Sequence, residues 1–260
     1  MTAIMRDSEY ELMAAVEPVH WWYCGLRDLI GRTLRKYALH EQSERRALDA
    51  GCGTGENLRL IQEVLHPTYL GGFDISPFAL EAARRKVPDA DVYHSDLCAP
   101  EFHADCYDVI LSCDAFSMLE TEEVRQGLAQ LASRLRPGGL LVMNLPAYRW
   151  LASEHDVAVG TRKRFTRTEV RQFFDASGLE PALVTYRVCA LFPAVVLARL
   201  PSMLGRRPPA EAARSDLARP LSRGNRRLLA VLRWENALIM RGVPLPCGSS
   251  VYAVGRRPLA

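Results

Sequence analysis

The stretch LDAGCGTGE, residues 48–56, constrains the fold of this chain more than any other. A short apolar run leads into Gly51, Gly53 and Gly55, and a helix-like segment begins at Glu56. Glycines in this position permit a tight turn and let a ligand approach the backbone closely. Unpaired N–H groups at the start of the following helix then face the ligand. We therefore predict a strand–loop–helix unit with a ligand-binding glycine loop.

Strand-like and helix-like segments alternate along most of the chain, which is typical of an α/β fold with a parallel sheet covered by helices on both faces. The predicted strands are 46–51, 69–76, 90–96, 107–116, 139–146, 181–189 and 249–257. The predicted helices between them are 56–65, 77–86, 121–135 and 167–177. Ser76-Pro77 starts the second helix, Pro137-Gly138-Gly139 ends the third, and Gly178 ends the fourth.

Two segments lie outside this alternation. Residues 1–45 are predicted to form a helical N-terminal cap, and residues 190–246 a helical insertion before the last strand. The predicted core is therefore 46–189 together with 247–260. The insertion contains the Pro/Arg/Ala-rich stretch GRRPPAEAARSDLARP, and a connection of this length usually has a functional role or is partly disordered.

Composition and charge narrow the function classes. A net charge of +3 gives no support for nucleic-acid binding. Ten arginines against three acidic residues in 199–241 form either a solvated helical face or a surface for an anionic substrate or membrane. The seven cysteines lack CxxC spacing, so we predict no metal site and no disulfide framework. Free thiols, a charged N-terminus and the lack of a long apolar run favour a cytoplasmic protein without a membrane span.

The spacing around the glycine loop indicates which ligand it binds. A dinucleotide site would show GxGxxG to seat a pyrophosphate, whereas this loop reads GxGxG. Asp49, just before the glycines, would repel a pyrophosphate but would suit a ligand that carries an ammonium group. S-adenosylmethionine has an ammonium, a carboxylate and a sulfonium, and it has no phosphate. We therefore favour this cofactor over NAD.

Acidic residues also end the next two predicted strands. Asp74 in GGFDIS lies 23 residues after Gly51, where an acid accepts hydrogen bonds from ribose hydroxyls. Asp96 in HSDL is placed to bind the adenine amino group, with the Leu97 backbone beside it. The polar segment SCDAFSML follows the fourth strand at the same edge, where ligands bind in open α/β sheets.

These stretches, with LRPGGLLVMNLP, resemble the class I S-adenosylmethionine-dependent methyltransferases over roughly residues 46–146. EHDVAVGTRKRFTRTEVRQFFDASGLE also resembles the lid and following helix of small-molecule members. The resemblance implies a seven-stranded sheet, mostly parallel, whose last strand is antiparallel. The cofactor residues it implies or that lie beside them are Asp49, Gly51, Gly53, Gly55, Asp74, Ile75, Asp96, Leu97 and Cys113.

Candidate catalytic residues lie in SEHDVAVGTRKRFT, directly after the fifth strand. His155 is our first choice for a general base, because its ordinary pKa is near working pH, and Glu154 is a second candidate. The alternative is that this segment only holds the lid loop together. Arg162, Lys163 and Arg164 form a basic patch that either clamps an anionic substrate group or starts a solvated helix.

The aromatic segment HWWYCGLRD, residues 20–28, gives two readings of equal weight. Trp22 and Tyr23 either cover the cofactor and contact the acceptor, or belong to an amphipathic helix packed on the sheet edge. In the first reading Tyr23 joins the catalytic candidates and Arg27 reaches the methionine carboxylate.

The predicted function is methyl transfer to a small molecule. An apolar acceptor with an anionic group, such as an isoprenoid diphosphate or a lipid-like compound, would fit the basic lid and the apolar insertion, and carbon methylation would fit such a compound. O- or N-methylation of a natural-product scaffold is the alternative. An NAD-dependent oxidoreductase and a non-catalytic cofactor-binding subunit are weaker hypotheses. The insertion serves either as a cap or as a contact in a homo-oligomer.

Overall fold

The computed structural model describes residues 5–38, 44–203 and 224–259. Its centre is a seven-stranded sheet in the order β3-β2-β1-β4-β5-β7-β6. The strands are β1 (Arg46–Ala50), β2 (Tyr69–Asp74), β3 (Asp91–His94), β4 (Tyr107–Cys113), β5 (Leu135–Pro146), β6 (Glu180–Arg187) and β7 (Ser250–Arg256). β7 is antiparallel to both of its neighbours, and the neighbouring pairs among β1 to β5 are parallel. The predicted fold class is confirmed.

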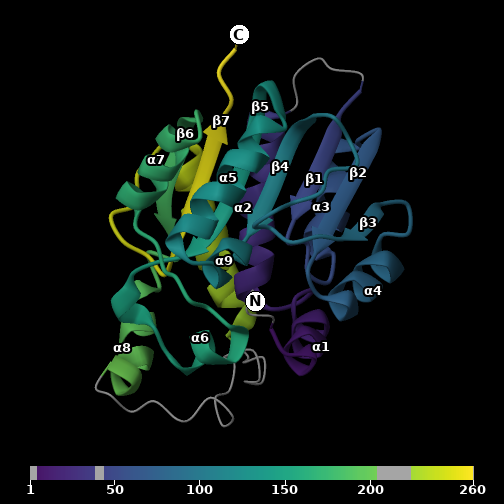
Figure 1. The fold of residues 1–260 in the computed structure, drawn as a ribbon. Helices are drawn as coiled ribbons and strands as arrows, with labels where there is room; N and C mark the ends of the chain where they lie inside the picture. Colours follow the sequence, from purple (N-terminus) through teal and green to yellow (C-terminus); the bar gives the residue numbers. More distant parts are fainter. Residues whose placement is uncertain (1–4, 39–43, 204–223, 260) are drawn as a thin grey trace.

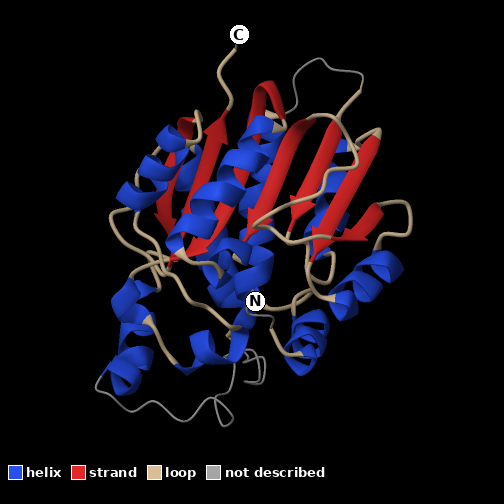
Figure 2. Ribbon diagram, in the orientation of Figure 1, coloured by secondary structure: helices blue, strands red, loops and turns tan. Residues whose placement is uncertain are grey.

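Helices cover both faces of this sheet, as the alternating pattern predicted (Figure 2). α5 (Thr121–Ser133) and α7 (Arg167–Ala176) lie on the near face in Figure 1, and α2 (Trp21–Tyr37), α3 (Glu56–Leu65) and α9 (Asn225–Met240) lie on the far face. α4 (Pro77–Lys86) packs beside β3 and α3. No described helix is long and apolar enough to cross a membrane.

The remaining helices gather at one edge of the sheet. α1 (Asp7–Val16), α6 (Glu154–Val159) and α8 (Phe192–Met203) lie below the sheet in Figure 1, where the parallel strands end. Two short 3-10 turns, η1 (Ala115–Met118) and η2 (Arg149–Leu151), continue β4 and β5 at this edge. Ligands in open α/β sheets bind at this carboxyl edge, so these elements enclose the place where a site is expected.

Local signals set most element boundaries. α3 and α4 span the predicted residues, and the Ser76 hydroxyl accepts a hydrogen bond from the backbone N–H of Ala79 at the start of α4. Thr166 and Glu169 form a capping box at the start of α7. Gly178, just after α7, has φ +69°, a conformation that glycine adopts without steric cost.

The end predicted for the helix over residues 121–135 is wrong. α5 stops at Ser133, and β5 already begins at Leu135. Pro137, Gly138 and Gly139 therefore lie within β5, where the pairing with β4 shifts register between Tyr107 and Val109. A Cβ on Gly139 would lie 2.8 Å from the Arg136 carbonyl oxygen, so the glycine is needed for a local irregularity in the strand.

The N-terminal helices and the insertion pack against each other. A Cβ on Gly25 in α2 would lie 2.5 Å from Cδ1 of Leu232 in α9, so the two helices are in close contact. The buried Asn236 of α9 donates hydrogen bonds to the Gly25 carbonyl at 2.8 Å and to Asp28 Oδ2 at 2.9 Å. The predicted insertion thus supplies α8 and α9, while its Pro/Arg/Ala-rich stretch lies outside the described residues.

Asn236→Ala should destabilise the fold by about 1–3 kcal/mol, because it removes the buried amide that donates to the Gly25 carbonyl and to Asp28 Oδ2 and leaves Asp28 with the Arg32 guanidinium. Urea unfolding followed by circular dichroism measures the change. Arg233→Ala, an exposed change on the same helix, is the control and should shift stability by no more than about 0.5 kcal/mol. Equal stabilities of the two variants would contradict this account of the α2–α9 contact.

Candidate functional site

A cavity of about 1050 Å³ opens at the carboxyl edge of the sheet. Its size matches the upper end of small-molecule sites, which leaves room for a cofactor and an acceptor together. Most of the residues predicted from the sequence line it. These are Gly51, Gly53, Asp74, Ile75, Asp96, Leu97, Cys113, Trp22, Tyr23, Arg27, Glu154, His155 and Arg164.

The glycine loop has the backbone that the sequence predicted. Gly51, Gly53 and Gly55 all have positive φ, at +79°, +52° and +85°. A Cβ on Gly51 would lie 2.4 Å from the Ala115 Cβ, and one on Gly55 would lie 2.9 Å from the Ala83 Cα. Side chains at these positions would therefore strain the loop and collide with its neighbours, which explains the GxGxG spacing.

Asp74 joins the glycine loop to β2. Its Oδ2 accepts a hydrogen bond from the Gly53 backbone N–H at 2.9 Å, and its Oδ1 accepts one from Ser76 at 3.0 Å. The Tyr10 hydroxyl of α1 also donates to Oδ1 at 3.4 Å. Burial raises the pKa of Asp74, although these hydrogen bonds oppose the shift. Asp74 thus lines the cavity where the ribose contact was predicted.

Asp49 is fully buried beneath the loop, and neither of its carboxylate oxygens has a hydrogen-bond partner. Burial, with smaller contributions from Asp74 and Glu17, raises its pKa to about 8. An unpaired buried carboxylate is costly unless a cation or donor reaches it. The chemistry of Asp49 therefore fits a ligand with an ammonium group, as the sequence predicted, although its side chain lies behind the residues that line the cavity.

The other predicted cofactor residues lie along the same wall. Asp96 accepts a hydrogen bond from the Cys98 backbone at 2.9 Å, which fixes the turn after β3, and Leu97 is buried beside it. Ile75 follows Asp74, and Cys113 is the last residue of β4. Gly55 is the N-cap residue of α3 and, like Asp49, supports the lining rather than forming it.

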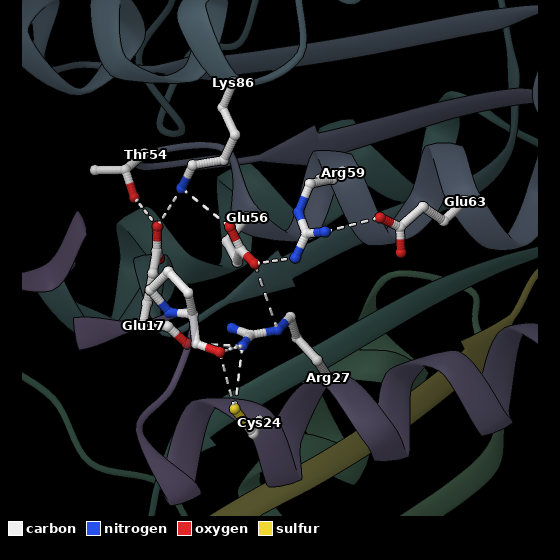
Figure 3. Close-up of polar contacts among 9 residues, drawn as sticks. Glu17, Cys24, Arg27, Thr54, Glu56, Arg59, Glu63 and Lys86 are labelled. Atoms are coloured by element: carbon white, nitrogen blue, oxygen red, sulfur yellow. Dashed lines mark hydrogen bonds and ion pairs between the residues drawn. The ribbon is translucent and has the colours of Figure 1, made fainter. Parts of the chain in front are cut away.

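An ion-pair network fastens the N-terminal helices to the glycine loop (Figure 3). Lys86 of α4 lies 2.5 Å from Glu17 Oε1 and 3.1 Å from Glu56 Oε2. The Thr54 hydroxyl donates to the same Glu17 oxygen at 2.5 Å. Arg27 donates to the Glu17 carbonyl at 2.7 Å, and its Nε lies 3.9 Å from Glu56. Arg27 thus faces the cavity from a fixed position, as a contact to the methionine carboxylate requires.

The aromatic segment forms the helix of the second reading, and its position at the cavity is compatible with the first. Trp22 and Tyr23 belong to α2, which packs on the sheet, and both rings also line the cavity. The cation over the Trp22 ring is the guanidinium of Arg187, at 4.8 Å. Burial, followed by the nearby carboxylates of Glu17 and Asp114, raises the pKa of Tyr23, so its hydroxyl stays protonated.

α6 contributes Glu154 and His155 to the cavity lining. The next residue, Asp156, is buried and pairs with Arg164 through contacts of 2.7 Å and 3.0 Å. Burial alone would raise the pKa of Asp156, but the hydrogen bonds and charge of Arg164 lower it overall. Arg199 of α8 lies 3.3 Å from the same carboxylate, so this cluster attaches α8 to α6.

The basic patch predicted as an anion clamp does not converge on the cavity. Arg164 uses its guanidinium on Asp156 and on the Ala147 carbonyl, at 2.8 Å. Arg162 and Lys163 lie outside the cavity lining and face Glu120 at 3.9 Å and Glu169 at 3.3 Å. This placement favours the structural reading of the patch over the clamp.

Residues 47–139 match the family model described as a methyltransferase domain. They include the glycine loop and the ends of β2, β3 and β4. This segment is a methyltransferase domain. This segment lies in a seven-stranded sheet with an antiparallel β7, which is the arrangement of the class I, Rossmann-like methyltransferases, and S-adenosylmethionine is the cofactor of that class. The unpaired Asp49, the positive-φ glycines and Asp74 are consistent with that cofactor.

Three known proteins show how far the similarity extends. Phthiotriol/phenolphthiotriol dimycocerosates methyltransferase 1 from Mycobacterium ulcerans is 26% identical over 55% of this chain and 54% of its own length. A Streptomyces venezuelae N,N-dimethyltransferase of dTDP-3-amino-3,4,6-trideoxy-alpha-D-glucopyranose is 30% identical over 37% of this chain and 40% of its own length. A Mesorhizobium loti S-adenosylmethionine-dependent methyltransferase structure aligns with a TM-score of 0.55 and 19% identity over 86% of this chain and 96% of that chain. The chain thus spans about half or less of the curated relatives, and the solved structure shows the fold.

Sequence reasoning missed several residues beside the methyltransferase domain's ligand edge. Tyr10 and Glu17 come from the N-terminal segment, and no motif marks them. The sequence shows Asp114 as a polar residue after β4, but it does not indicate the positive φ of +60° that this residue adopts. Asn144 lies two residues before the end of β5 and Arg187 ends β6, and the burial of both could not be read from the sequence.

Binding of S-adenosylmethionine at pH 7 should release up to about one more proton from the wild-type protein than from Asp49→Asn. With a pKa of about 8, Asp49 is mostly protonated at pH 7 before binding, and a ligand ammonium would lower that pKa. Calorimetric titrations in two buffers of different ionisation enthalpy measure the number of protons. Asp89→Asn, at an exposed position, should match the wild type. Equal proton release by all three proteins would show that Asp49 does not meet the ammonium.

Proposed function

We propose that the protein transfers the methyl group of S-adenosylmethionine to a small-molecule acceptor. The supporting observation is the cavity itself, which is continuous from the glycine loop and Asp74 to Glu154 and His155 on α6. A shared space of about 1050 Å³ would let an acceptor lie in line with the methyl group. The match of residues 47–139 to a methyltransferase domain adds to this.

The donor methyl group is already activated. The chain's own residues would therefore bind and orient the donor and the acceptor and exclude water from them. Tyr23, whose raised pKa keeps it protonated, would donate a hydrogen bond to the acceptor. His155 and Glu154 would move a proton where the acceptor must lose one. Arg27 would hold the methionine carboxylate, and Asp49 the ammonium.

The acceptor is proposed to have an apolar part. Val195 and Ala198 of α8 line the cavity beside Arg199. By their names, the Mycobacterium relative acts on phthiotriol dimycocerosates and the Streptomyces relative methylates an amino sugar, so the similarity leaves both lipid and natural-product acceptors open. A diphosphate acceptor would require Arg162 and Lys163 to turn toward the cavity from outside its lining.

The alternative functions make different binding predictions. An NAD-dependent oxidoreductase would have to place a pyrophosphate near the buried, unpaired Asp49. A non-catalytic cofactor-binding subunit would bind S-adenosylmethionine and never transfer its methyl group. Calorimetry with both nucleotides, followed by a transfer assay with labelled donor, separates these hypotheses from the one proposed.

Asp74→Asn should weaken S-adenosylmethionine binding by about 10- to 100-fold, since one charge-assisted hydrogen bond is worth about 1.5–3 kcal/mol. The variant keeps one acceptor oxygen for Gly53 or Ser76, so the loop should stay folded. Isothermal calorimetry gives the affinity and thermal unfolding checks the fold. Asp89→Asn should bind as the wild type does. An unchanged affinity in folded Asp74→Asn would contradict the ribose assignment.

A further inference from the structure

Asp114 occupies a backbone conformation that aims its side chain along the cavity. It directly follows β4 and has φ +60°, the left-handed region that costs a non-glycine residue energy. Hydrogen bonds from the Ser117 backbone at 3.0 Å and from the Ser117 hydroxyl at 2.6 Å hold its carbonyl. The half-buried side chain lines the cavity.

Asn144 holds the Asp114 carboxylate in place. Its Nδ2 donates to both carboxylate oxygens, at 3.0 Å and 2.9 Å, and its carbonyl accepts from the Asp114 backbone N–H at 2.7 Å. Asn144 is fully buried and pairs with Cys113 in the β4–β5 ladder, so its position is fixed by the sheet. Among the described residues, no lysine or arginine nitrogen lies within 4.0 Å of the Asp114 carboxylate.

Arg187 lies behind Asn144 at the end of β6 and is almost completely buried. Its Nη1 donates to Asn144 Oδ1 at 3.4 Å, its Nη2 donates to the Trp22 carbonyl at 3.3 Å, and its Nε has no partner. Arg187, Asn144 and Asp114 thus form one row across the sheet edge. The negative end of this row faces the cavity.

The charges around Asp114 keep it ionised near neutral pH. Burial raises its pKa to about 6, and Asn144, Arg187 and Arg164 limit the rise. Tyr23 on α2 and the Cys113 thiol also interact with Asp114, and burial raises the pKa of both groups. Asp114 is therefore a carboxylate at pH 7 and can accept a proton at small cost.

The arginines that line the cavity are already engaged with protein groups. Arg27 binds the Glu17 carbonyl, Arg164 pairs with Asp156, and Arg199 donates to the Leu151 carbonyl and contacts Asp156. An anionic acceptor would have to break these contacts. A cationic group, by contrast, would meet the Asp114 carboxylate without displacing an ion pair.

We propose that the acceptor is an amine, and that Asp114 binds its ammonium group and takes a proton from it, with Asn144 and Arg187 as positioning residues. This inference rests on the proposed methyltransferase function. The ammonium gives one proton to an Asp114 carboxylate oxygen, which frees the nitrogen lone pair. Nitrogen then bonds to the methyl carbon as the carbon–sulfur bond breaks. The products are a methylammonium and a thioether, and the proton passes from Asp114 to solvent.

Asp114→Asn tests the assignment with four matched sets of small molecules: primary amines, their N-acetyl forms, and the corresponding alcohols and carboxylic acids. With labelled S-adenosylmethionine, the wild type should label the amine set. Asp114→Asn should lower kcat/KM for amines by about 100-fold or more, as expected when a proton acceptor is removed. Its cofactor affinity should stay within about twofold of the wild type, because the amide has nearly the shape of the carboxylate and Asp114 is assigned to the acceptor and not to the cofactor. Glu122→Gln, an exposed change on α5, is the control.

Label in the alcohol or acid set alone, or full amine activity in Asp114→Asn, would overturn the amine proposal and leave methyl transfer intact. No label in any set, from protein that binds the donor, would instead contradict the proposed function and remove the amine proposal with it. The two failures are therefore distinguishable in one experiment.

Asn144→Ala should move the acidic limb of the pH–kcat/KM profile from about 6 to higher pH, because it removes the donor that lowers the pKa of Asp114. Carboxyl carbon NMR of labelled aspartate, assigned with Asp114→Asn, follows the same titration without substrate. Ser112→Ala, whose buried hydroxyl donates only to the Ala50 carbonyl at 2.8 Å, is the matched control and should leave the limb in place. In the wild-type protein alone, an Asp114 carboxyl that titrates at about 8, as the unpartnered Asp49 does, would refute the positioning row, even where Asn144→Ala fails to fold.

Discussion

Lys86 lies between the carboxylates of Glu17 and Glu56, and the cavity of this protein depends on that contact. Both carboxylates are almost completely buried, so Glu17 would carry a large desolvation cost without this cation, while Glu56 also pairs with Arg59 at 2.5 Å. The cation joins three elements that are distant in the sequence: the end of α1, the start of α3 and the end of α4. Once they are joined, Tyr10 reaches Asp74 and Arg27 reaches the cavity wall. The N-terminal helices are therefore part of the binding site.

The sheet and the glycine loop could be predicted because their signals are local. A strand that leads into positive-φ glycines and then into a helix is encoded by adjacent residues, and Ser76 with Pro77 marks the start of α4 in the same way. The end of α5 was missed because Pro137 and Gly138 are compatible with a helix terminus and equally with an irregular strand. Only the pairing of β5 with β4 decides between them.

The basic patch shows why charge alone predicted less. Arg162, Lys163 and Arg164 are adjacent in sequence, but their side chains find partners on three different acids. Asp156, only eight residues before Arg164, binds the Arg164 guanidinium, and no sequence signal ranks that contact over a ligand anion. Arg187 shows the opposite case. Its sequence position suggests an exposed polar residue at the end of a strand, but tertiary packing buries it beneath Trp22.

Two carboxylates at the same sheet edge differ in their environments, and that difference assigns them separate roles. Asp49 has no hydrogen-bond partner, so burial raises its pKa to about 8 and it becomes charged only when a cation arrives. Asp114 has the Asn144 amide and the Arg187 charge behind it, so its pKa stays near 6 and it is charged in advance. Environments that separate two pKa values in this way commonly mark groups with different acid–base roles in one site. A donor with an α-ammonium group suits the first carboxylate, and an acceptor that must lose a proton suits the second.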